Sequence, residues 1–344
     1  MQKKSIAVIF GGCSSEYEVS LQSAFAILEH LNSEKYNIIP IGITRQGDWY
    51  RYHGEYVKLL SDTWTQNPAE LTSVTVSHNR STKGIIENGN TITKLDFAFP
   101  VLHGKNGEDG TVQGLFELAG IPVIGCGTMS SALCMDKDRA HKLVEAAGIA
   151  VPKAVTLRSP SQIDKANGLT YPLFVKPVRA GSSFGITKVS TPDELPAAVE
   201  LAFSHDDIVI IEENVDGFEV GCAVLGMDDD LTVGRVDEIE LSDGFFDYTE
   251  KYTLRSSKIH MPARIDAECE KRIRETAKLI YQVLGCSGFA RVDMFLRPDG
   301  MIVFNEVNTI PGFTSHSRYP NMMKGIGLTF TGILEKLIGL YDHE

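Results

Sequence analysis

The beginning of the chain alternates between apolar strands and an amphipathic helix. Residues 6–10 are uniformly apolar and are followed by a Gly-Gly pair, which is typical of a buried strand that ends in a turn. Apolar residues then recur at helical spacing over residues 19–31, and residues 37–43 form a further apolar run. Because a strand, a helix and a strand in this order build a parallel sheet covered by helices, the predicted fold class is α/β.

The length of 344 residues exceeds that of one ordinary hydrophobic core, so more than one domain is expected. A composition shift near residues 125–128 marks one boundary, and a strand at residues 208–212 leads out of the middle third. The pattern predicts three α/β segments at residues 1–130, 131–218 and 219–344, the last with a polar loop at about 241–257. One helix is predicted from about Ser130 through Val144, and residues 60–94 define no element.

Charge and cysteine usage narrow the functional classes. The net charge of -12 repels polyanions, so nucleic acid is excluded as a partner. No apolar run reaches the length of a membrane span, and the short run near the N-terminus is no secretory signal. The six cysteines are dispersed without metal-binding spacing, which indicates free thiols in a reducing compartment. We therefore expect a cytoplasmic protein without a membrane partner.

A predicted hairpin at residues 290–308 carries four polar side chains on one face. Because side chains two apart on a strand share a face, Arg291 and Asp293 form one pair, and Glu306 and Asn308 the other. With an even loop, Arg291 is expected opposite Glu306, with Asp293 one diagonal away. Such oxygen ligands suit Mg²⁺, which fills its other positions with water and phosphate oxygens. The alternative is a surface hairpin with a salt bridge.

A second pattern is typical of a phosphate site. The segment Lys-Pro-Val-Arg-Ala-Gly-Ser-Ser-Phe-Gly at residues 176–185 joins a strand to a loop whose N–H groups can approach phosphate closely. It is neither a Walker P-loop nor a dinucleotide fingerprint, and a plain hairpin loop remains the alternative. Lys137, Lys176 and Lys251 could supply positive charge to a triphosphate, although each alone is more typical of a solvated surface.

These motifs combine into a resemblance to a known family. The matching pieces, in order, occupy residues 11–20, 102–114, 135–137, 175–185, 250–252, 291–293 and 305–317. Along essentially its whole length the chain resembles the D-alanine–D-alanine ligase family of the ATP-grasp superfamily, and within it the ligases of vancomycin resistance. The resemblance implies three α/β domains, with ATP held between the central and C-terminal domains, and a homodimer.

The resemblance also implies the cofactor sites. ATP contacts fall on Lys137, Lys176, Ser182, Glu212, Val215, Glu219 and Lys251. Within this set Lys137 and Lys176 would hold the phosphates under the Ser182 loop. Glu212 and Val215 would meet the adenine, and Glu219 would take the ribose hydroxyls. Magnesium, as two ions with manganese as a substitute, would be bound by Asp293, Glu306 and Asn308.

The implied reaction phosphorylates the D-alanine carboxylate, and a second amine then attacks through a tetrahedral intermediate. The implied catalytic residues are Glu16, Ser182, Tyr252, Arg291 and Gly312. The implied substrate contacts are Glu16, His103, Arg291, Ser317 and Arg318, with Lys251 also near the second carboxylate. Arg291 and the Gly312 amide would stabilise the oxyanion. Without the family, Glu16 would favour a helix N-terminus, His103 a turn, and Tyr252 an ordinary partly buried aromatic residue.

Two features bear on the second substrate. Arg318 follows Ser317 where ordinary D-alanine ligases usually place Leu, and a guanidinium offers hydrogen bonds to a substrate hydroxyl. The loop at residues 243–252 resembles that of D-serine ligases. We therefore predict a D-alanine–D-serine ligase of peptidoglycan synthesis and vancomycin resistance. The alternatives are a D-alanine–D-alanine ligase with a solvated Arg318, a D-lactate ligase, another ATP-grasp carboxylate–amine ligase, and a non-catalytic nucleotide-binding protein.

Overall fold

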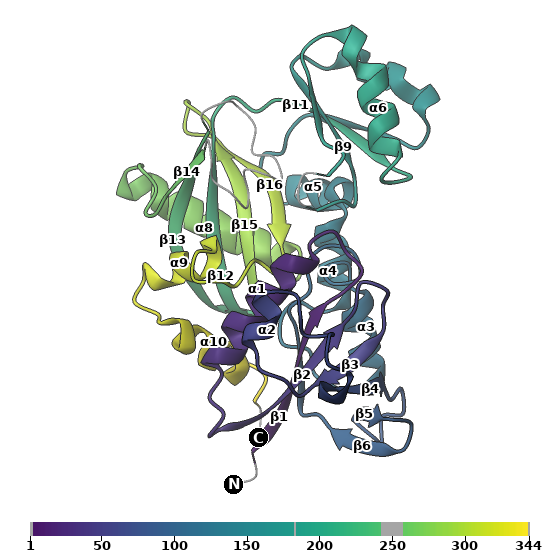
Figure 1. Ribbon diagram of the computed structural model, residues 1–344. Helices are drawn as coiled ribbons and strands as arrows, with labels where there is room; N and C mark the ends of the chain where they lie inside the picture. The colour runs from purple at the N-terminus through teal and green to yellow at the C-terminus, as the bar shows by residue number, and fades with distance from the viewer. Residues whose placement is uncertain (1–2, 182–183, 242–256, 343–344) are drawn as a thin grey trace.

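The computed structural model describes residues 3–181, 184–241 and 257–342. These residues form three separate sheets, each accompanied by helices, and Figure 1 shows the first unit at the bottom, the middle unit at the upper right and the last unit at the left. The predicted α/β fold class is confirmed. No helix among the described residues is long and apolar enough to cross a membrane.

The first sheet has the strand order β6-β5-β4-β3-β2-β1-β7. Its strands are β1 (Lys4–Gly11), β2 (Tyr36–Ile43), β3 (Trp49–Tyr52), β4 (Leu71–Val76), β5 (Gly84–Glu87), β6 (Thr91–Lys94) and β7 (Phe97–Pro100). The accompanying helices are α1 (Tyr17–His30), α2 (Val57–Leu60), η1 (Pro68–Glu70) and α3 (Thr111–Ala119). β1 pairs in parallel with both β2 and β7, so the apolar run at its centre is buried on both faces. The antiparallel strands β4 to β6 lie within residues 60–94, the stretch for which the sequence predicted no element.

The predicted helix at residues 130–144 is wrong in one respect, because two helices occupy this stretch. α4 (Thr128–Met135) ends at Asp136, and α5 (Lys137–Ala146) begins directly after it. Asp136 leaves the helical conformation, and its carboxylate accepts the Arg139 amide as the N-cap of α5. The cap places Lys137 at the first position of a new helix, where its side chain can turn into the centre of the molecule.

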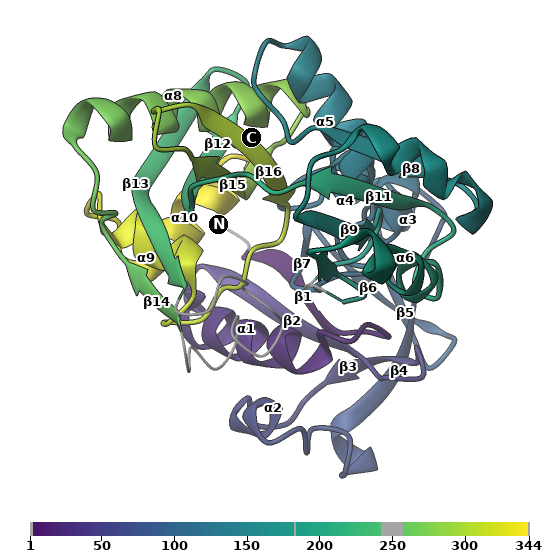
Figure 2. The same ribbon diagram turned by 90° about the horizontal axis from the view of Figure 1, so that it is seen from above.

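Figure 2 shows the third sheet at the left and the second sheet at the right, with α5 between them at the top. The four-stranded sheet has the order β10-β9-β11-β8 and the five-stranded sheet the order β14-β13-β12-β15-β16. The middle unit contains β8 (Ala154–Leu157), η2 (Pro160–Gly168), β9 (Leu173–Pro177), β10 (Thr187–Val189), η3 (Pro192–Glu194), α6 (Leu195–Phe203) and β11 (Val209–Glu213). The last unit contains β12 (Phe218–Met227), β13 (Asp230–Leu241), β14 (Ser257–His260), α8 (Ala267–Val283), β15 (Gly288–Leu296), β16 (Ile302–Asn308), α9 (Arg318–Lys324) and α10 (Phe330–Gly339).

The register of the β15–β16 hairpin differs from the prediction. Arg291 lies opposite Asn308 and Asp293 lies opposite Glu306, with a register shift between Asp293 and Met294. The shift leaves Asn305 without a partner, as in a β-bulge. The turn is odd in length, so an unbroken ladder would place Glu306 on the face of the apolar residues. The bulge therefore brings the four polar side chains onto one face.

One hydrophobic core joins the first sheet to the last. It contains residues of β1 and α1 together with residues of β12, β15, α9 and α10. Phe289 stands at its centre with edge-on ring contacts to three aromatic residues: Phe99 at 6.0 Å, Phe313 at 5.7 Å and Tyr319 at 5.6 Å between centroids. The N-terminal and C-terminal units are thus held as one packed body at this point.

We expect Phe289→Ala to lower the free energy of unfolding by about 3–5 kcal/mol, because it leaves a cavity where the two units meet. Leu118→Ala is the control, since Leu118 is 69% exposed and should change stability by less than about 0.5 kcal/mol. Urea unfolding followed by circular dichroism measures both. Equal midpoints for the two variants would show that the units do not depend on this aromatic contact.

Candidate active site

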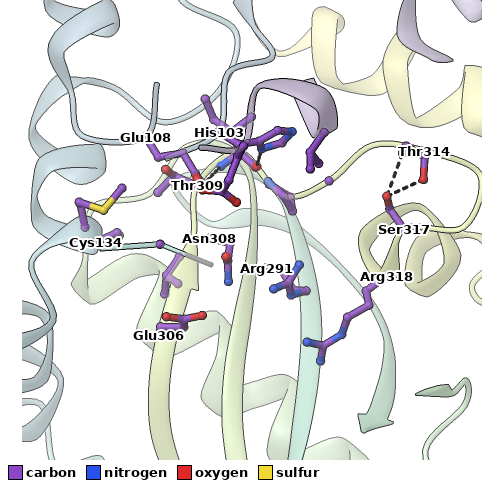
Figure 3. A pocket seen from close by; sticks show the side chains of 18 of the residues that line it. His103, Glu108, Cys134, Arg291, Glu306, Asn308, Thr309, Thr314, Ser317 and Arg318 are labelled. Carbon is purple, nitrogen blue, oxygen red and sulfur yellow. Dashed lines mark hydrogen bonds between the residues drawn. The ribbon is translucent and has the colours of Figure 1, made fainter. Parts of the chain in front are cut away.

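A pocket of ≈ 330 Å³ opens where the first and last sheets meet the α4–α5 pair. Its wall includes the start of α1, the loop after β7, the end of β16 and the segment that leads into α9 (Figure 3). Of the predicted site residues, it is lined by Glu16, His103, Lys137, Arg291, Glu306, Asn308, Gly312, Ser317 and Arg318. The fold thus brings together residues that lie up to 302 positions apart, Glu16 and Arg318.

The floor of the pocket is the polar face of β15 and β16. Arg291 donates to both oxygens of Asp293 at 2.7–3.1 Å, and the Asn308 amide donates to Asp293 at 2.9 Å. Asp293 is 1% exposed and lies beneath the lining, whereas Glu306 and Asn308 reach it. Among the described residues no group of three or more His, Cys, Asp or Glu could hold a metal unaided. This donor set fits Mg²⁺, which takes few protein oxygens and completes its shell with phosphate and water.

The two predicted phosphate lysines lie in different surroundings. Lys137 donates to the Ala180 carbonyl at 2.8 Å, and its ammonium lies 3.6 Å from Glu306. Lys176 donates to Glu212 at 2.6 Å. Burial raises the pKa of Glu212, but the combined attraction of Lys176, His141 and Lys137 outweighs it, so the pKa is lowered. Of these two lysines, both among the described residues, Lys137 lines the pocket and Lys176 does not. Val215, Glu212 and Lys176 lie outside it, toward the second sheet.

Glu16 and the loop after β7 meet at the pocket wall. A Cβ added at Gly104 or Gly181 would lie 2.7 Å or 3.0 Å from the Glu16 carboxylate, so both glycines permit this close approach. His103 is 4% exposed, and both its ring nitrogens face protein groups. Its Nδ1–H donates to the Ile310 carbonyl at 2.8 Å, which leaves Nε2 as an acceptor. Burial lowers the pKa of His103, so the neutral ring is favoured.

Arg318 extends from the first position of α9 into a group of carboxylates. Its guanidinium donates to both oxygens of Asp237 at 2.7–2.8 Å and to Glu219 at 2.9 Å, and lies 3.3 Å from Asp293. A Cβ at Gly221 would overlap this guanidinium, so any other residue there would displace Arg318 from its carboxylates. Ser317 accepts the Thr314 amide at 2.9 Å, and the two hydroxyls are 2.8 Å apart (Figure 3). Arg318 is therefore not a solvated residue.

Sequence reasoning missed two acidic residues at the site. Asp237 is fully buried on β13 and accepts from Arg318 and from the Gly221 amide. Glu108 lines the pocket and accepts the amides of Gly104 and Ile310, each at 3.0 Å. Burial, and then the charge of Glu16, raise the pKa of Glu108 to about 8. No local signal marks Asp237, because its strand also carries Arg235, Glu238 and Glu240, whereas Glu108 lies within the matching segment at residues 102–114.

Three predicted site residues, Ser182, Lys251 and Tyr252, lie outside the described residues, as does nearly all of the predicted polar loop at about 241–257. Their assigned contacts with ATP and substrate stay predictions.

Comparisons with known proteins cover the whole chain. Residues 5–126 match the family model for the D-ala D-ala ligase N-terminus, and residues 143–339 match that for the C-terminus. The solved structure of VanG D-Ala:D-Ser ligase from Enterococcus faecalis is 69% identical with a TM-score of 0.94, covering 99% of this chain and 100% of that one. Vancomycin B-type resistance protein VanB of Enterococcus faecalis and C-type protein VanC1 of Enterococcus gallinarum are 48% and 43% identical, each over 99% of both chains.

The buried neutral His103 should make the protein less stable in mild acid. The pKa of His103 in the folded protein is lowered from 6.5. Its contribution to the free energy of unfolding is therefore fully present above pH 6.5 and is lost as the pH falls toward the folded pKa. We expect the melting temperature to fall more steeply below pH 6.5 for the wild type than for His103→Asn. His53→Asn, at an exposed histidine, is the control and should keep the wild-type slope. Equal slopes for all three proteins would contradict the assignment.

Proposed function

Because this chain belongs to the D-alanine–D-alanine ligase family and has its ATP-grasp fold, we propose that it makes D-alanyl-D-serine with ATP. The product would serve peptidoglycan precursor synthesis and vancomycin resistance. The observation that carries the choice of D-serine is Arg318, held at the pocket wall by Asp237 and Glu219. The full-length similarity to a D-Ala:D-Ser ligase supports the same choice.

In the proposed reaction the D-alanine carboxylate attacks the γ-phosphorus of ATP, and ADP leaves as the acyl phosphate forms. Glu16 at the pocket wall holds the ammonium of this first substrate. Arg291 and the Gly312 amide face the pocket, where they stabilise charge on the acyl oxygen as the unprotonated second amine adds, gives up one proton to become the amide nitrogen, and phosphate leaves. Lys137 lies at the same floor and offsets phosphate charge.

Magnesium would be bound by Glu306, Asn308 and Asp293 on the polar face of the hairpin. When bound, it supplies positive charge to the phosphate oxygens, with manganese as a substitute. Lys176 and Glu212 lie next to one another on the second sheet, which supports the proposal that the phosphates and the adenine of bound ATP lie against this sheet. Val215 and Glu219 complete the proposed base and ribose contacts.

The remaining roles rest on the family. We propose that Ser182, Glu16 and Tyr252 form a hydrogen-bonded clasp that closes the polar loop over the bound substrates and excludes water, since an acyl phosphate hydrolyses readily. Lys251 and Ser317 would bind the carboxylate of the second substrate. We also propose a cytoplasmic homodimer, with domains at residues 1–130, 131–218 and 219–344, and size-exclusion chromatography with light scattering tests the dimer.

The first test is phosphate release from ATP and Mg²⁺ by the purified protein. It receives D-alanine alone, then D-alanine with D-serine or with D-lactate, and mass spectrometry identifies the products. We expect D-alanyl-D-serine to dominate when both amines are present at equal concentration. A dominant D-alanyl-D-alanine product would leave the ligase assignment in place and overturn the choice of D-serine. Absence of any stimulation by D-amino acids would overturn the proposed function.

Replacement of Arg318 by Leu should shift the D-serine to D-alanine ratio of kcat/KM toward D-alanine by roughly tenfold or more, because the pocket loses the donor proposed for the hydroxyl of D-serine. Removal of the guanidinium also leaves Asp237 buried without its cation, so Arg318→Leu is combined with Asp237→Asn. Arg318→Lys is the matched control, which keeps the charge and loses the planar fork. An unchanged ratio in the Leu variants would remove the argument from Arg318.

A further inference from the structure

The segment from Ile310 to Phe313 belongs to the C-terminal unit, yet its main chain is held by the N-terminal unit. The Ile310 carbonyl accepts from His103 Nδ1 at 2.8 Å, and the Ile310 amide donates to Glu108 Oε1 at 3.0 Å. At the other end, the Phe313 amide donates to the Ser23 hydroxyl oxygen at 3.2 Å. Three main-chain groups are thus bound by side chains more than 200 positions away.

The three side chains are also linked to one another. Ser23 lies on the buried face of α1, is 0% exposed, and its hydroxyl lies 3.3 Å from His103 Nε2. Because Nδ1 donates to Ile310, Nε2 must accept, so the Ser23 O–H points to the ring while its lone pair receives the Phe313 amide. Glu108 binds the Gly104 amide with its other oxygen, next in sequence to His103. Figure 3 shows His103 and Glu108 above the end of β16.

The arrangement leaves one donor of the segment open. Pro311 has no N–H, and the amides of Ile310 and Phe313 are both used. Within the part of the chain that the structure describes, the Gly312 amide makes no hydrogen bond, and Gly312 lines the pocket. The amide lies between two fixed neighbours and beside Ser317, whose hydroxyl would lie 3.0 Å from a Cβ at Gly312.

We propose that Ser23 and Glu108, acting with His103, are positioning residues that fix the Gly312 amide as the oxyanion donor of the ligase reaction. This inference rests on the proposed function, since Gly312 has this role only if an acyl phosphate is attacked there. The preformed donor binds the tetrahedral state more strongly than the ground state, because a fixed N–H stabilises charge that develops on the acyl oxygen during attack. His103, with both ring nitrogens bound to protein, holds the segment and moves no proton to the substrate.

The test compares Ser23→Ala with Ser20→Ala. Ser20 lies one turn earlier on the same helix, is also 0% exposed, and also makes two hydrogen bonds, to the Gly11 amide and the Val101 carbonyl. Its bonds stay within the N-terminal unit, so it matches Ser23 in type, burial and hydrogen bonding without touching the 310–313 segment. Steady-state kinetics with ATP and D-alanine, plus the preferred second amine, give kcat and each KM.

Ser23→Ala should lower kcat by roughly tenfold or more, part of the full effect of losing an oxyanion donor, while the KM for ATP changes by less than about twofold. Its affinity for a phosphinate dipeptide, a charged tetrahedral analogue of the attack step, should weaken by a factor similar to the fall in kcat. Ser20→Ala should keep the wild-type kcat and the wild-type affinity for the analogue. A role in folding alone would lower the melting temperature without this matched loss of analogue binding.

Glu108→Gln is the second variant, assayed at pH 9, above the Glu108 pKa of about 8, where the wild-type carboxylate accepts both main-chain amides. The Gln side chain has one acceptor oxygen and turns its NH₂ toward the other main-chain N–H. Like Ser23→Ala, this variant should have a lower kcat and should bind the analogue more weakly by a similar factor. If both variants turn over and bind the analogue as Ser20→Ala does, the inference is wrong while the ligase assignment stands. If both fail to fold, the residues are structural and the inference is also wrong. If the wild type shows no D-alanine-dependent turnover, the proposed function itself fails.

Discussion

The centre of this protein depends on the mutual neutralisation of buried charges beneath the pocket. Arg291 and Arg318 share Asp293, and Arg318 also binds Asp237 and Glu219. A buried charge without its partner costs several kcal/mol, so β12, β13, β15 and α9 must each keep the register that brings these groups together. Arg318 is 8% exposed in its side chain, and Asp237 is not exposed at all. The site is therefore organised by its own charges before any substrate enters.

The bulge in β16 connects this charge cluster to the rest of the site. It turns Glu306 and Asn308 toward the pocket while Phe304 and Val307 remain in the core. The unpaired Asn305 does not leave its carbonyl free, because His141 of α5 donates to it at 2.9 Å. The same helix begins with Lys137, whose ammonium lies near Glu306. One irregular residue in a strand thus sets the relation between the proposed metal face and the proposed phosphate lysine.

The pocket is an interface between units that are distant in sequence. The aromatic cluster around Phe289 packs the first sheet against the last, and the polar contacts from Ser23, His103 and Glu108 continue that interface to the pocket wall. Apolar packing supplies most of the stabilisation, because it is proportional to buried area, whereas hydrogen bonds fix orientation. Burial at the same interface keeps His103 neutral and raises the pKa of Glu108.

The sequence by itself determined the α/β class, the family and most of the residues that meet at the pocket. The spacing of apolar residues is a local property, so it predicts strands and helices without coordinates. The motifs carry their own chemistry, so Glu16, Lys137, Arg291 and Arg318 could be named as site residues from the sequence. Only the tertiary structure decided the register of the hairpin, since a single bulge at Asn305 is invisible to a two-residue period. It also decided that Asp237 and Ser23 belong to the site. Their contacts reach across 81 and 290 positions, and no local pattern encodes a partner that only packing brings near.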